Sequence, residues 1–545
     1  MGEDMAEQFD VVVIGAGFGG LHMLWKLRGL GESAVALERA GDVGGTWYWN
    51  RYPGARCDVP SVEYSVPWDR ELEQEWDWSE RYSAQPEILA YIEEVARRHD
   101  LKRDIRFETT VTAITRDEER GLWVVETDTG TPFEAPVVIS AAGCLSTPNL
   151  PDIPGIEDFA RPLHHTGRWP HDPVGFEGKN VGVIGTGSTG VQASTAIAAE
   201  AGHLFVFQRT AQYSLPALNR PLTKDEKAEA KRTYGKLRHV QRNSFGAATI
   251  EPPMAMKAFA IAKEKRFAEY ERRWNIGRQD LLAAFADIGT DAEVNAEVSE
   301  WVRGKIRGIV DDPDLAEKLC PTVNPFGTRR IIMDTGYFEI FNQDNVSLVD
   351  IREDPIARIT QTGAQLESGR FIELDMLVIA TGYDAVTGPL LDMNITGKGG
   401  QKLNDKWAHG PETWLGLMMH GFPNLFTITG PQSPTVHANV IMAIEQHVDW
   451  IADCLQYMDT EGIAEIEPRH ESEVEWAMTV AAIGSANLRA KDTNNWYLGQ
   501  NVPGKPVSYM TYQGGLDRYR KVCDEVAADG YRGFDLRRMD AAADA

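Results

Sequence analysis

Residues 159–190 read FARPLHHTGRWPHDPVGFEGKNVGVIGTGSTG, and this segment ends in the most informative turn of the chain. An apolar run at 181–184 leads directly into glycines at 185, 187 and 190, and an alanine-rich segment follows. This order predicts a strand, a tight glycine turn and a helix, the arrangement that lets a pyrophosphate approach the backbone at a helix N-terminus. We therefore expect a dinucleotide-binding fold whose turn contains Gly185, Gly187 and Gly190.

A second turn of the same kind lies near the start of the chain. Residues 11–14 read VVVI, and glycines follow at positions 15, 17 and 20. One G-x-G-x-x-G motif is a weak signal, but two of them, each between a strand pattern and a helix pattern, indicate two bound dinucleotides. We expect Gly15, Gly17 and Gly20 to form one cofactor site and the turn at 185–190 to form the other.

The residues that follow the second strand of each unit distinguish the two sites. Glu38 stands 18 residues past Gly20, where an acid hydrogen-bonds a ribose 2′-hydroxyl. Arg209, followed by Thr210, stands 19 residues past Gly190, and a cation there accommodates a 2′-phosphate. The first site is therefore predicted to hold FAD and the second NADPH. The alternatives are a solvated strand end at Glu38 and a merely exposed Arg209.

The composition limits the possible partners. The chain has 545 residues, of which 43% are hydrophobic and 25% charged, as is typical of globular domains. Its formal net charge of −26 argues against nucleic acid as a partner. No apolar run is long enough to span a membrane, and the acidic N-terminus does not resemble a signal peptide. The five cysteines form no C-x-x-C pair, so we expect no metal site, no redox disulfide and a cytoplasmic location.

The order of these patterns predicts how the chain is divided. A proline-rich run at 148–154 indicates a hinge, and residues 221–318 have helical spacing with few strand signals. We predict an α/β fold with two Rossmann-like dinucleotide-binding domains (FAD and NADP) and a helical insertion. The predicted parts are residues 1–147 and 384–545 for the FAD-binding domain, 148–214 and 325–383 for the NADP-binding domain, and 215–324 for the helical insertion.

Two further segments contain candidates for chemistry. Residues 44–58 form an aromatic, glycine-rich loop that includes Arg56 and Asp58, and loops beyond a nucleotide fold often carry catalytic groups. Arg329 and Arg330 precede an apolar strand pattern, which would place them at the mouth of a sheet, where ligands bind. The alternatives are core packing for the aromatic residues, a surface ion pair for Arg56 and Asp58, and a solvated basic pair for the two arginines.

The C-terminal part adds a loop that leads into a helix and a loop that could close a site. Residues 425–437 lead from a strand pattern into a helix pattern, and His437 stands at this junction. A histidine here is more often a capping or pocket residue than a catalyst. Residues 494–506 are polar and interrupted by glycine and proline, which makes them a candidate lid.

On these residues the chain resembles the type I Baeyer–Villiger monooxygenases, in the phenylacetone, cyclohexanone and steroid monooxygenase group, over essentially all of positions 9 to 535. The family fingerprint F-x-G-x-x-x-H-x-x-x-W-P falls on Phe159, Arg161, His165, Trp169 and Pro170, and only Arg161, in place of glycine, departs from it. The pattern G-G-x-W-x-x-x-x-[FY]-P-G-x-x-x-D matches completely from position 44 to position 58. Because arginine takes a positive φ only at a cost, the turn at Arg161 is expected to differ from that of the family.

The resemblance implies a role for each matching residue. Arg330 is implied to be the catalytic arginine, which stabilises developing negative charge, and Asp58 the acid that orients it. His165 is implied to be a hinge residue rather than an acid–base group. The implied FAD and NADPH contacts, besides the motif glycines and Glu38, are Gly45, Thr46, Trp47, Arg56, Asp58, Tyr64, Ser188, Thr189, Gln192, Arg209, Thr210, Arg329 and Trp496. The implied ketone pocket is lined by Thr435, Val436 and His437.

The resemblance also implies the reaction. NADPH would reduce FAD, the reduced flavin would bind O₂ as a C4a-peroxide, and its attack on a ketone would insert one oxygen atom beside the carbonyl to give an ester or lactone. The nearest alternative is an N- or S-oxygenating flavin-containing monooxygenase, which usually lacks the ending found at Trp169 and Pro170. A non-catalytic dinucleotide-binding redox sensor is the alternative from another class, and the cysteine spacing excludes a disulfide reductase. We expect a monomer or weak homo-oligomer, and the choice of ketone stays open.

Overall fold

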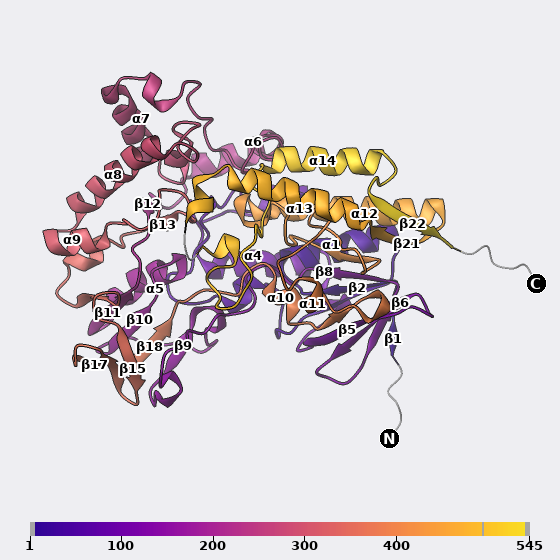
Figure 1. Cartoon of the computed structure of the whole chain (residues 1–545), viewed down its shortest axis with the longest axis horizontal. Coiled ribbons are helices and arrows are strands. Elements are labelled where there is room, and N and C mark those ends of the chain that lie inside the picture. The colour runs from indigo at the N-terminus through magenta and orange to yellow at the C-terminus, as the bar shows by residue number, and fades with distance from the viewer. Residues whose placement is uncertain (1–5, 493–494, 540–545) are drawn as a thin grey trace, which may run out of the picture.

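The computed structural model describes residues 6–492 and 495–539. Two parallel sheets lie at opposite ends of its long axis, each covered by helices (Figure 1). The chain begins in the first sheet, crosses to the second, continues into a helical segment, and then returns to complete both sheets. As a result, both ends of the chain lie at the same end of the molecule (Figure 1).

The first sheet has the strand order β20-β8-β2-β3-β4. Its central strand, β2 (Val11–Ile14), is buried at every position, because helices cover both faces of a parallel sheet. This explains the unbroken apolar run in the sequence. The other strands are β3 (Ala34–Leu37), β4 (Ile105–Arg106), β8 (Val137–Ser140) and β20 (Leu425–Thr427).

The second sheet has the order β14-β11-β10-β18-β9 and is also parallel. Its central strand is β10 (Asn180–Ile184), which is flanked by β11 (His203–Gln208) and β18 (Met376–Ile379). The edge strands are β14 (Val346–Asp350) and β9 (Leu163–His165). Strands from before and after the helical segment therefore share one sheet.

Smaller sheets extend this framework. A sheet of order β1-β7-β6-β5-β19 consists of β1 (Glu7–Gln8), β5 (Val111–Asp117), β6 (Leu122–Thr127), β7 (Phe133–Ala135) and β19 (Ile395–Thr396). An antiparallel sheet consists of β15 (Ile356–Thr360), β16 (Gly363–Leu366) and β17 (Phe371–Glu373). Two strand pairs complete the set: β12 (Ser214–Pro216) with β13 (Ile332–Asp334), and β21 (Ile463–Pro468) with β22 (Phe534–Arg538).

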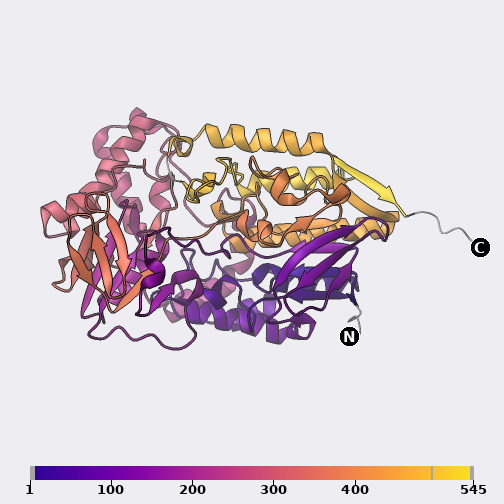
Figure 2. The same cartoon turned by 60° about the horizontal axis from the view of Figure 1, so that its bottom comes forward.

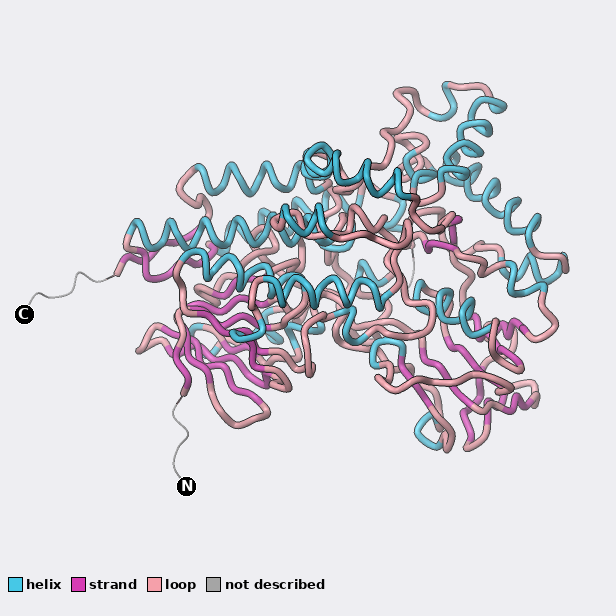
Figure 3. The backbone as a smooth tube through the Cα atoms, turned by 180° about the vertical axis from the view of Figure 1, so that it is seen from behind, coloured by secondary structure: helices cyan, strands magenta, loops and turns pink. Residues whose placement is uncertain are grey.

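Long helices cover the first sheet, and several of them run side by side when the molecule is seen from behind (Figure 3). α1 (Phe18–Leu30) packs against α12 (Val440–Glu461), which also contacts α14 (Leu516–Ala528). The other helices here are α2 (Thr46–Trp49), α3 (Arg70–Glu75), α4 (Gln85–Arg98), α10 (Gly388–Leu391), α11 (Leu403–Lys406) and α13 (His470–Ser485). α5 (Ser188–Ala198) packs on the second sheet. Each described helix is too short or too polar to cross a lipid bilayer.

The helical segment contains α6 (Lys224–Arg242), α7 (Lys263–Ile276), α8 (Ala292–Ile309) and α9 (Pro313–Leu319). α7, α8 and α9 lie at one end of the molecule (Figures 1 and 2), whereas α6 lies nearer its middle (Figure 1). A buried arginine, Arg238, ties α6 to the first domain, since it donates to Glu73 at 2.8 Å and to Ser65 at 2.6 Å. Removing one partner of a fully buried ion pair of this kind lowers the stability of the protein by about 3–5 kcal/mol. The ion pair therefore holds α6 against α3.

This architecture agrees with the predicted α/β class, two sheets and a helical insertion. The domain limits derived from the sequence stay predictions, since the sheets define which strands associate but not where a domain ends.

Candidate active site

The first glycine turn connects β2 to α1, and its glycines are needed for two different reasons. A Cβ at Gly15, whose φ is +99°, would lie 2.7 Å from the carbonyl oxygen of Ala141, and a Cβ at Gly20 would lie 1.9 Å from that of Gly15. The fold itself therefore requires these two glycines. Gly17 has an ordinary φ of −80°, and the nearest atom to an added Cβ is the Cα of Gly45 at 3.5 Å. Packing does not explain its missing side chain, but a pyrophosphate that approaches the backbone does.

Glu38 faces the same turn from the end of β3. Its carboxylate oxygens accept hydrogen bonds from the N–H of Ala16 at 2.7 Å and of Ala40 at 2.8 Å. Burial raises the pKa of Glu38, although these N–H groups and Arg39 oppose the rise. An acid at this position beside the N-terminus of α1 fits the ribose hydroxyls of a dinucleotide.

The loop at 44–58 packs directly onto the first turn. The N–H of Gly44 donates to the oxygen of Ala16 at 3.1 Å, and a Cβ at Gly45 would lie 3.0 Å from the Cα of Gly17. The two backbones thus meet without side chains between them. This glycine-lined contact fits a cofactor that lies across both turns.

Two predicted cofactor contacts in this loop interact with each other. α2 begins at Thr46, and the indole N–H of Trp47 donates to the hydroxyl of Tyr64 at 3.2 Å. Both rings are buried and pack edge to face. The structure therefore gathers Gly45, Thr46, Trp47 and Tyr64 beside the first turn.

The second glycine turn repeats the first. A Cβ at Gly185, whose φ is +113°, would lie 2.4 Å from the oxygen of Ala380, and a Cβ at Gly190 would lie 2.0 Å from that of Gly185. Gly187 has a φ of −77°, and an added Cβ would have no protein atom within 4 Å. The missing side chain at Gly187 is again explained by a ligand rather than by packing. The two sites therefore have the same construction.

The residues predicted to select NADPH lie at the mouth of this second turn. Arg209 is exposed directly after β11. The hydroxyl of Thr186, in the glycine turn, donates to the carbonyl oxygen of Thr210 at 2.8 Å, so the strand end and the turn are joined. Ser188 and Thr189 begin α5, where free N–H groups favour a phosphate.

Asp58 and Arg330 form a two-point ion pair, although 272 positions separate them. The Nε of Arg330 lies 2.5 Å from one carboxylate oxygen, and its Nη2 lies 2.8 Å from the other. Its Nη1 donates to the carbonyl oxygen of Val436 at 2.7 Å. This planar geometry fixes the guanidinium more firmly than a single contact would. The pair thus joins loop 44–58, the segment before β13 and the loop before α12.

Arg330 keeps its positive charge in this setting. Burial alone would lower its pKa, but the charge and hydrogen bonds of Asp58, together with Tyr497, raise it above the usual value. The half-buried guanidinium therefore remains a cation throughout the physiological pH range. The neighbouring thiol of Cys57 has a pKa raised mainly by burial and also by Asp58, so it stays protonated and is a poor nucleophile.

The loop that supplies Val436 is backbone-strained. Thr429, Gln432 and Thr435 have positive φ values of 55°, 66° and 28°. A positive φ is rare for residues other than glycine and especially so for a β-branched residue such as Thr435. Strain of this kind clusters at functional sites, where the surrounding structure holds it in place. This supports a functional role for the segment at 429–437.

His437, at the end of this loop, is a neutral hydrogen-bonding residue. Its Nε2 lies 2.7 Å from the hydroxyl of Thr511, and its Nδ1 lies 3.2 Å from an Nη1 of Arg489. Burial, Arg489 and Arg330 hold its pKa well below the usual value. The same Nη1 lies 3.4 Å from Nε2, so Arg489 contacts both ring nitrogens. Of the predicted pocket residues, Thr435 is buried, while Val436 and His437 are half-buried.

The fingerprint residues lie in and around β9, the edge strand of the second sheet. Phe159 and Trp169 are buried, and Pro170 is half-buried. The Nδ1 of His165, in β9, accepts a hydrogen bond from the N–H of Gly167 at 2.9 Å. Burial lowers the pKa of His165 to about 4, so it is neutral at pH 7. This agrees with the structural role implied for it.

Arg161 does not adopt the backbone conformation that would require glycine. It is absent from the described residues other than glycine that have a positive φ. Instead, its guanidinium donates to Leu374 at 2.7 Å and forms ion pairs with Asp375 at 2.9 Å and Glu373 at 3.0 Å. The arginine therefore ties the fingerprint to the turn between β17 and β18.

Two further predicted cofactor contacts, Arg56 and Gln192, also make contacts within the protein. The guanidinium of Arg56 pairs with Glu80. The side chain of Gln192, on α5, accepts from the hydroxyl of Tyr52 at 2.8 Å and donates to the backbone oxygen of Arg56 at 3.1 Å. Gln192 thus holds loop 44–58 against α5, and the cofactor roles of both residues stay predictions.

The last two predicted contacts involve the C-terminal segment. Arg329 pairs with the buried Asp492 at 3.1 Å. Trp496 is half-buried, stacks on Tyr497 with ring centroids 4.1 Å apart, and packs near Val386. The predicted lid overlaps these positions, but its first residue, 494, lies outside the described residues together with 493.

Sequence reasoning missed Arg489, Asp492 and Tyr497, which surround the two arginines. Nothing in their spacing pairs them with a turn more than 150 positions earlier. The only available signal was charge next to a predicted lid, in the run RAKD at 489–492.

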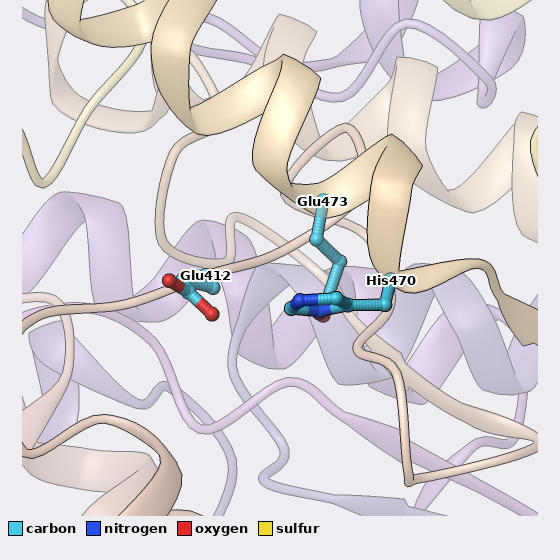
Figure 4. A group of neighbouring side chains, drawn as sticks. All are labelled: Glu412, His470 and Glu473. Carbon is cyan, nitrogen blue, oxygen red and sulfur yellow. The ribbon is translucent and has the colours of Figure 1, made fainter.

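Among the residues that the structure describes, one group of potential metal ligands occurs elsewhere, at Glu412, His470 and Glu473 (Figure 4). Glu473 already accepts from the Nζ of Lys406 at 2.8 Å and from the N–H of His420 at 2.7 Å. A cation would have to displace the lysine. The group is therefore better described as a buried ion pair with two neighbouring side chains.

Comparison with known proteins agrees with this geometry. The family model for pyridine nucleotide-disulphide oxidoreductases matches residues 12–242. The chain is 42% identical over 532 residues to a cyclohexanone 1,2-monooxygenase of Acinetobacter sp., covering 97% of each. It is 42% identical over 526 residues to a Baeyer–Villiger monooxygenase of Pseudooceanicola batsensis, covering 96% of this chain and 95% of the relative. It is also 40% identical over 531 residues to a phenazine N-monooxygenase of Lysobacter antibioticus, covering 97% of each.

Solved structures give the same result. An oxidized steroid monooxygenase bound to NADP is 46% identical, with a TM-score of 0.93 over 98% of this chain and 100% of that one. The OTEMO complex with FAD and NADP is 37% identical, with a TM-score of 0.92 over the same shares. The fold and the two cofactor turns define a flavoprotein monooxygenase with two dinucleotide-binding domains. Within that class, the chain belongs to the Baeyer–Villiger monooxygenase family.

These findings confirm the predicted family, fold class and enzyme class, and the predicted pair of cofactors, FAD and NADPH. The roles of individual residues stay predictions, which the geometry above supports to different extents.

Proposed function

We propose that this protein uses NADPH, FAD and O₂ to insert one oxygen atom beside the carbonyl of a ketone, which gives an ester or lactone. The observation that carries this proposal is the two-point Asp58–Arg330 pair, which fixes a permanent cation between loop 44–58 and the strained loop at 429–437. A cation fixed in this way would stabilise an oxyanion that forms during the reaction.

The chain's residues fit both cofactors. Gly17, Gly45 and Glu38 would hold FAD, because the glycines leave the backbone open and Glu38 offers a ribose acceptor. Gly187 and Arg209 would hold NADPH at its pyrophosphate and 2′-phosphate. The flavin, when reduced by NADPH, supplies the activation of O₂.

Arg330 would stabilise the negative charge that develops on the substrate oxygens. Its place is fixed by Asp58 and by the carbonyl oxygen of Val436, so the cation needs no reorganisation during the reaction. Preorganised charge of this kind is often the largest catalytic term. His437, Val436 and Thr435 would form the adjoining wall of the ketone site.

The test is oxidation of NADPH by the FAD-loaded protein with a panel of linear, cyclic, aromatic and steroid ketones, followed by mass spectrometry of the products. We expect at least one ketone to yield an ester or lactone heavier by one oxygen atom. NADPH oxidation that releases only hydrogen peroxide across the panel would contradict the proposal.

Nitrogen oxygenation is the second candidate, because one relative of 40% identity is named as a phenazine N-monooxygenase. The same assay separates the two reactions when a heteroaromatic amine is added to the panel. An N-oxide without any ester or lactone would favour the second candidate.

Arg209→Ala is expected to raise KM for NADPH about 10- to 100-fold and to leave KM for NADH within about twofold. The reason is that loss of one charge-assisted contact to the 2′-phosphate costs about 1.5–3 kcal/mol, and NADH lacks that phosphate. Steady-state kinetics with both nucleotides measures the effect. Arg358→Ala is the matched control, because Arg358 is an exposed residue of β15 in the same predicted domain and pairs with Asp158 at 3.3 Å. Equal KM changes in both variants would contradict the role of Arg209.

We also propose that the protein is a monomer or weak homo-oligomer of the cytoplasm. All five cysteines are free and buried, which suits a reducing compartment. Size-exclusion chromatography with light scattering would test the oligomeric state.

A further inference from the structure

Arg489 lies in the C-terminal segment and reaches the turn that presents the catalytic arginine. Its Nε donates to the carbonyl oxygen of Thr328 at 2.8 Å, and its Nη2 donates to that of Gly327 at 3.1 Å. These are the two carbonyl groups immediately before Arg329 and Arg330. The backbone that leads into the arginine pair is therefore held by a side chain from more than 150 positions later.

The remaining donors of Arg489 hold two other segments. Nη1 donates to the side-chain oxygen of Gln513 at 3.1 Å and lies 3.2 Å from Nδ1 of His437. The guanidinium carbon also lies 4.6 Å from the ring centroid of Tyr497. Because an arginine has five N–H donors in a rigid fork, one side chain can contact all these groups at once.

Tyr497 links Arg489 to the loop at 429–437. Its ring stacks on His437 with centroids 4.5 Å apart and on Trp496 with centroids 4.1 Å apart. His437 directly follows Val436, whose carbonyl oxygen accepts from Arg330. Arg489 is thus connected to Arg330 by two routes, through the turn at 327–328 and through His437.

We propose that Arg489 is a positioning residue, which docks residues 488–492 and 495–498 onto the turn at 327–330 (the arginine turn) and thereby fixes Arg330 and His437 for the oxygenation step. This inference rests on the proposed function for its effect on catalysis, but the docking itself does not. Asn495 and Asp492 contribute to the same contact, since Asn495 donates to the carbonyl oxygen of Thr328 at 3.3 Å and Asp492 accepts from the hydroxyl of Thr328 at 3.2 Å.

Two substitutions separate geometry from charge. Arg489→Met keeps much of the volume and removes every donor. Arg489→Lys keeps the positive charge, but its single ammonium cannot span both carbonyl groups, Gln513 and His437. The proposal depends on the forked arrangement of the guanidinium donors rather than on the positive charge. Arg489→Lys is therefore expected to resemble Arg489→Met more than the unaltered protein.

The first measurement is the amount of oxygenated product formed per NADPH consumed, together with the rate at which NADPH reduces FAD without oxygen. Arg489→Met is expected to lower the product ratio about tenfold and to leave flavin reduction within about threefold. Arg532→Met is the control, because Arg532 is an exposed residue whose nearest acid, Asp529, lies 3.7 Å away. An unchanged product ratio in Arg489→Met, or full recovery of the ratio in Arg489→Lys, would overturn the proposal.

The second measurement does not depend on oxygenation. Limited thermolysin digestion of the FAD-loaded protein, followed by mass spectrometry, reports how fast the segment at 488–505 is cut. Faster cleavage there in Arg489→Met than in Arg532→Met, at equal thermal stability, supports docking by Arg489. Equal cleavage, or a general loss of stability with cuts throughout the chain, refutes it. If no ketone is oxygenated by the unaltered protein, the proposed function fails while this measurement still decides the docking.

Discussion

Alanine at position 330 is expected to lower the yield of oxygenated product by about 100- to 1,000-fold, the range seen when a preorganised oxyanion donor is removed. NADPH should still reduce FAD, because the glycine turns and Glu38 are built from other parts of the chain. Product analysis by mass spectrometry and anaerobic loss of flavin absorbance measure the two steps separately. A normal ester or lactone yield would remove Arg330 from the mechanism.

Two companion variants identify what Arg330 contributes. Arg330→Lys keeps the charge but loses the two-point contact with Asp58, so we expect a smaller loss than with alanine. Asp58→Asn keeps a side chain of the same size and removes the charge that raises the pKa of Arg330. Arg358→Ala, at an exposed residue of β15 that pairs with Asp158, serves as the control and should leave the product yield unchanged. A loss in Arg330→Lys as large as in alanine would assign the role to geometry rather than charge.

The parts of the site that depend on local patterns could be predicted from the sequence. Each glycine turn could be recognised because a strand, a turn and a helix follow one another within about 20 residues. Glu38 and Arg209 could be assigned for the same reason, since each stands at a fixed distance after its turn. Asp58 and Arg330 could not be paired by spacing and were linked only through the resemblance to a known family.

The contacts around the arginine turn were beyond sequence reasoning, because they depend on how distant segments are folded together. Arg489 reads as one more charged residue beside a polar loop until the fold brings it to Gly327 and Thr328. The ion pair of Arg56 is a similar case. The predicted cofactor contact of Arg56 stays a prediction, but its pairing with Glu80 could not be read from the sequence, because no spacing places that acid beside the loop.

The middle glycine of each turn gives the second large expected effect. Gly17→Ala is expected to lower FAD content of the purified protein at least about tenfold, because the added methyl group would stand between the backbone and the pyrophosphate. Gly187→Ala is expected to leave FAD content normal and to raise KM for NADPH about 10- to 100-fold. Overpacking a tight contact costs about 1–3 kcal/mol, which corresponds to this range. Flavin absorbance after purification and steady-state kinetics measure the two results.

The strength of this comparison is that neither substitution disturbs the protein's own packing. An added Cβ at Gly187 has no protein atom within 4 Å, and one at Gly17 makes only an ordinary 3.5 Å contact. Gly190→Ala would be uninformative, because its Cβ would lie 2.0 Å from the oxygen of Gly185 and the turn itself would shift. Gly235→Ala is the matched control, since a Cβ there also has no protein atom within 4 Å, and alanine in a helix interior is stabilising. If Gly187→Ala behaves like Gly235→Ala in NADPH kinetics, the second turn does not bind the nucleotide, and the division of the two cofactors between the two sheets is wrong.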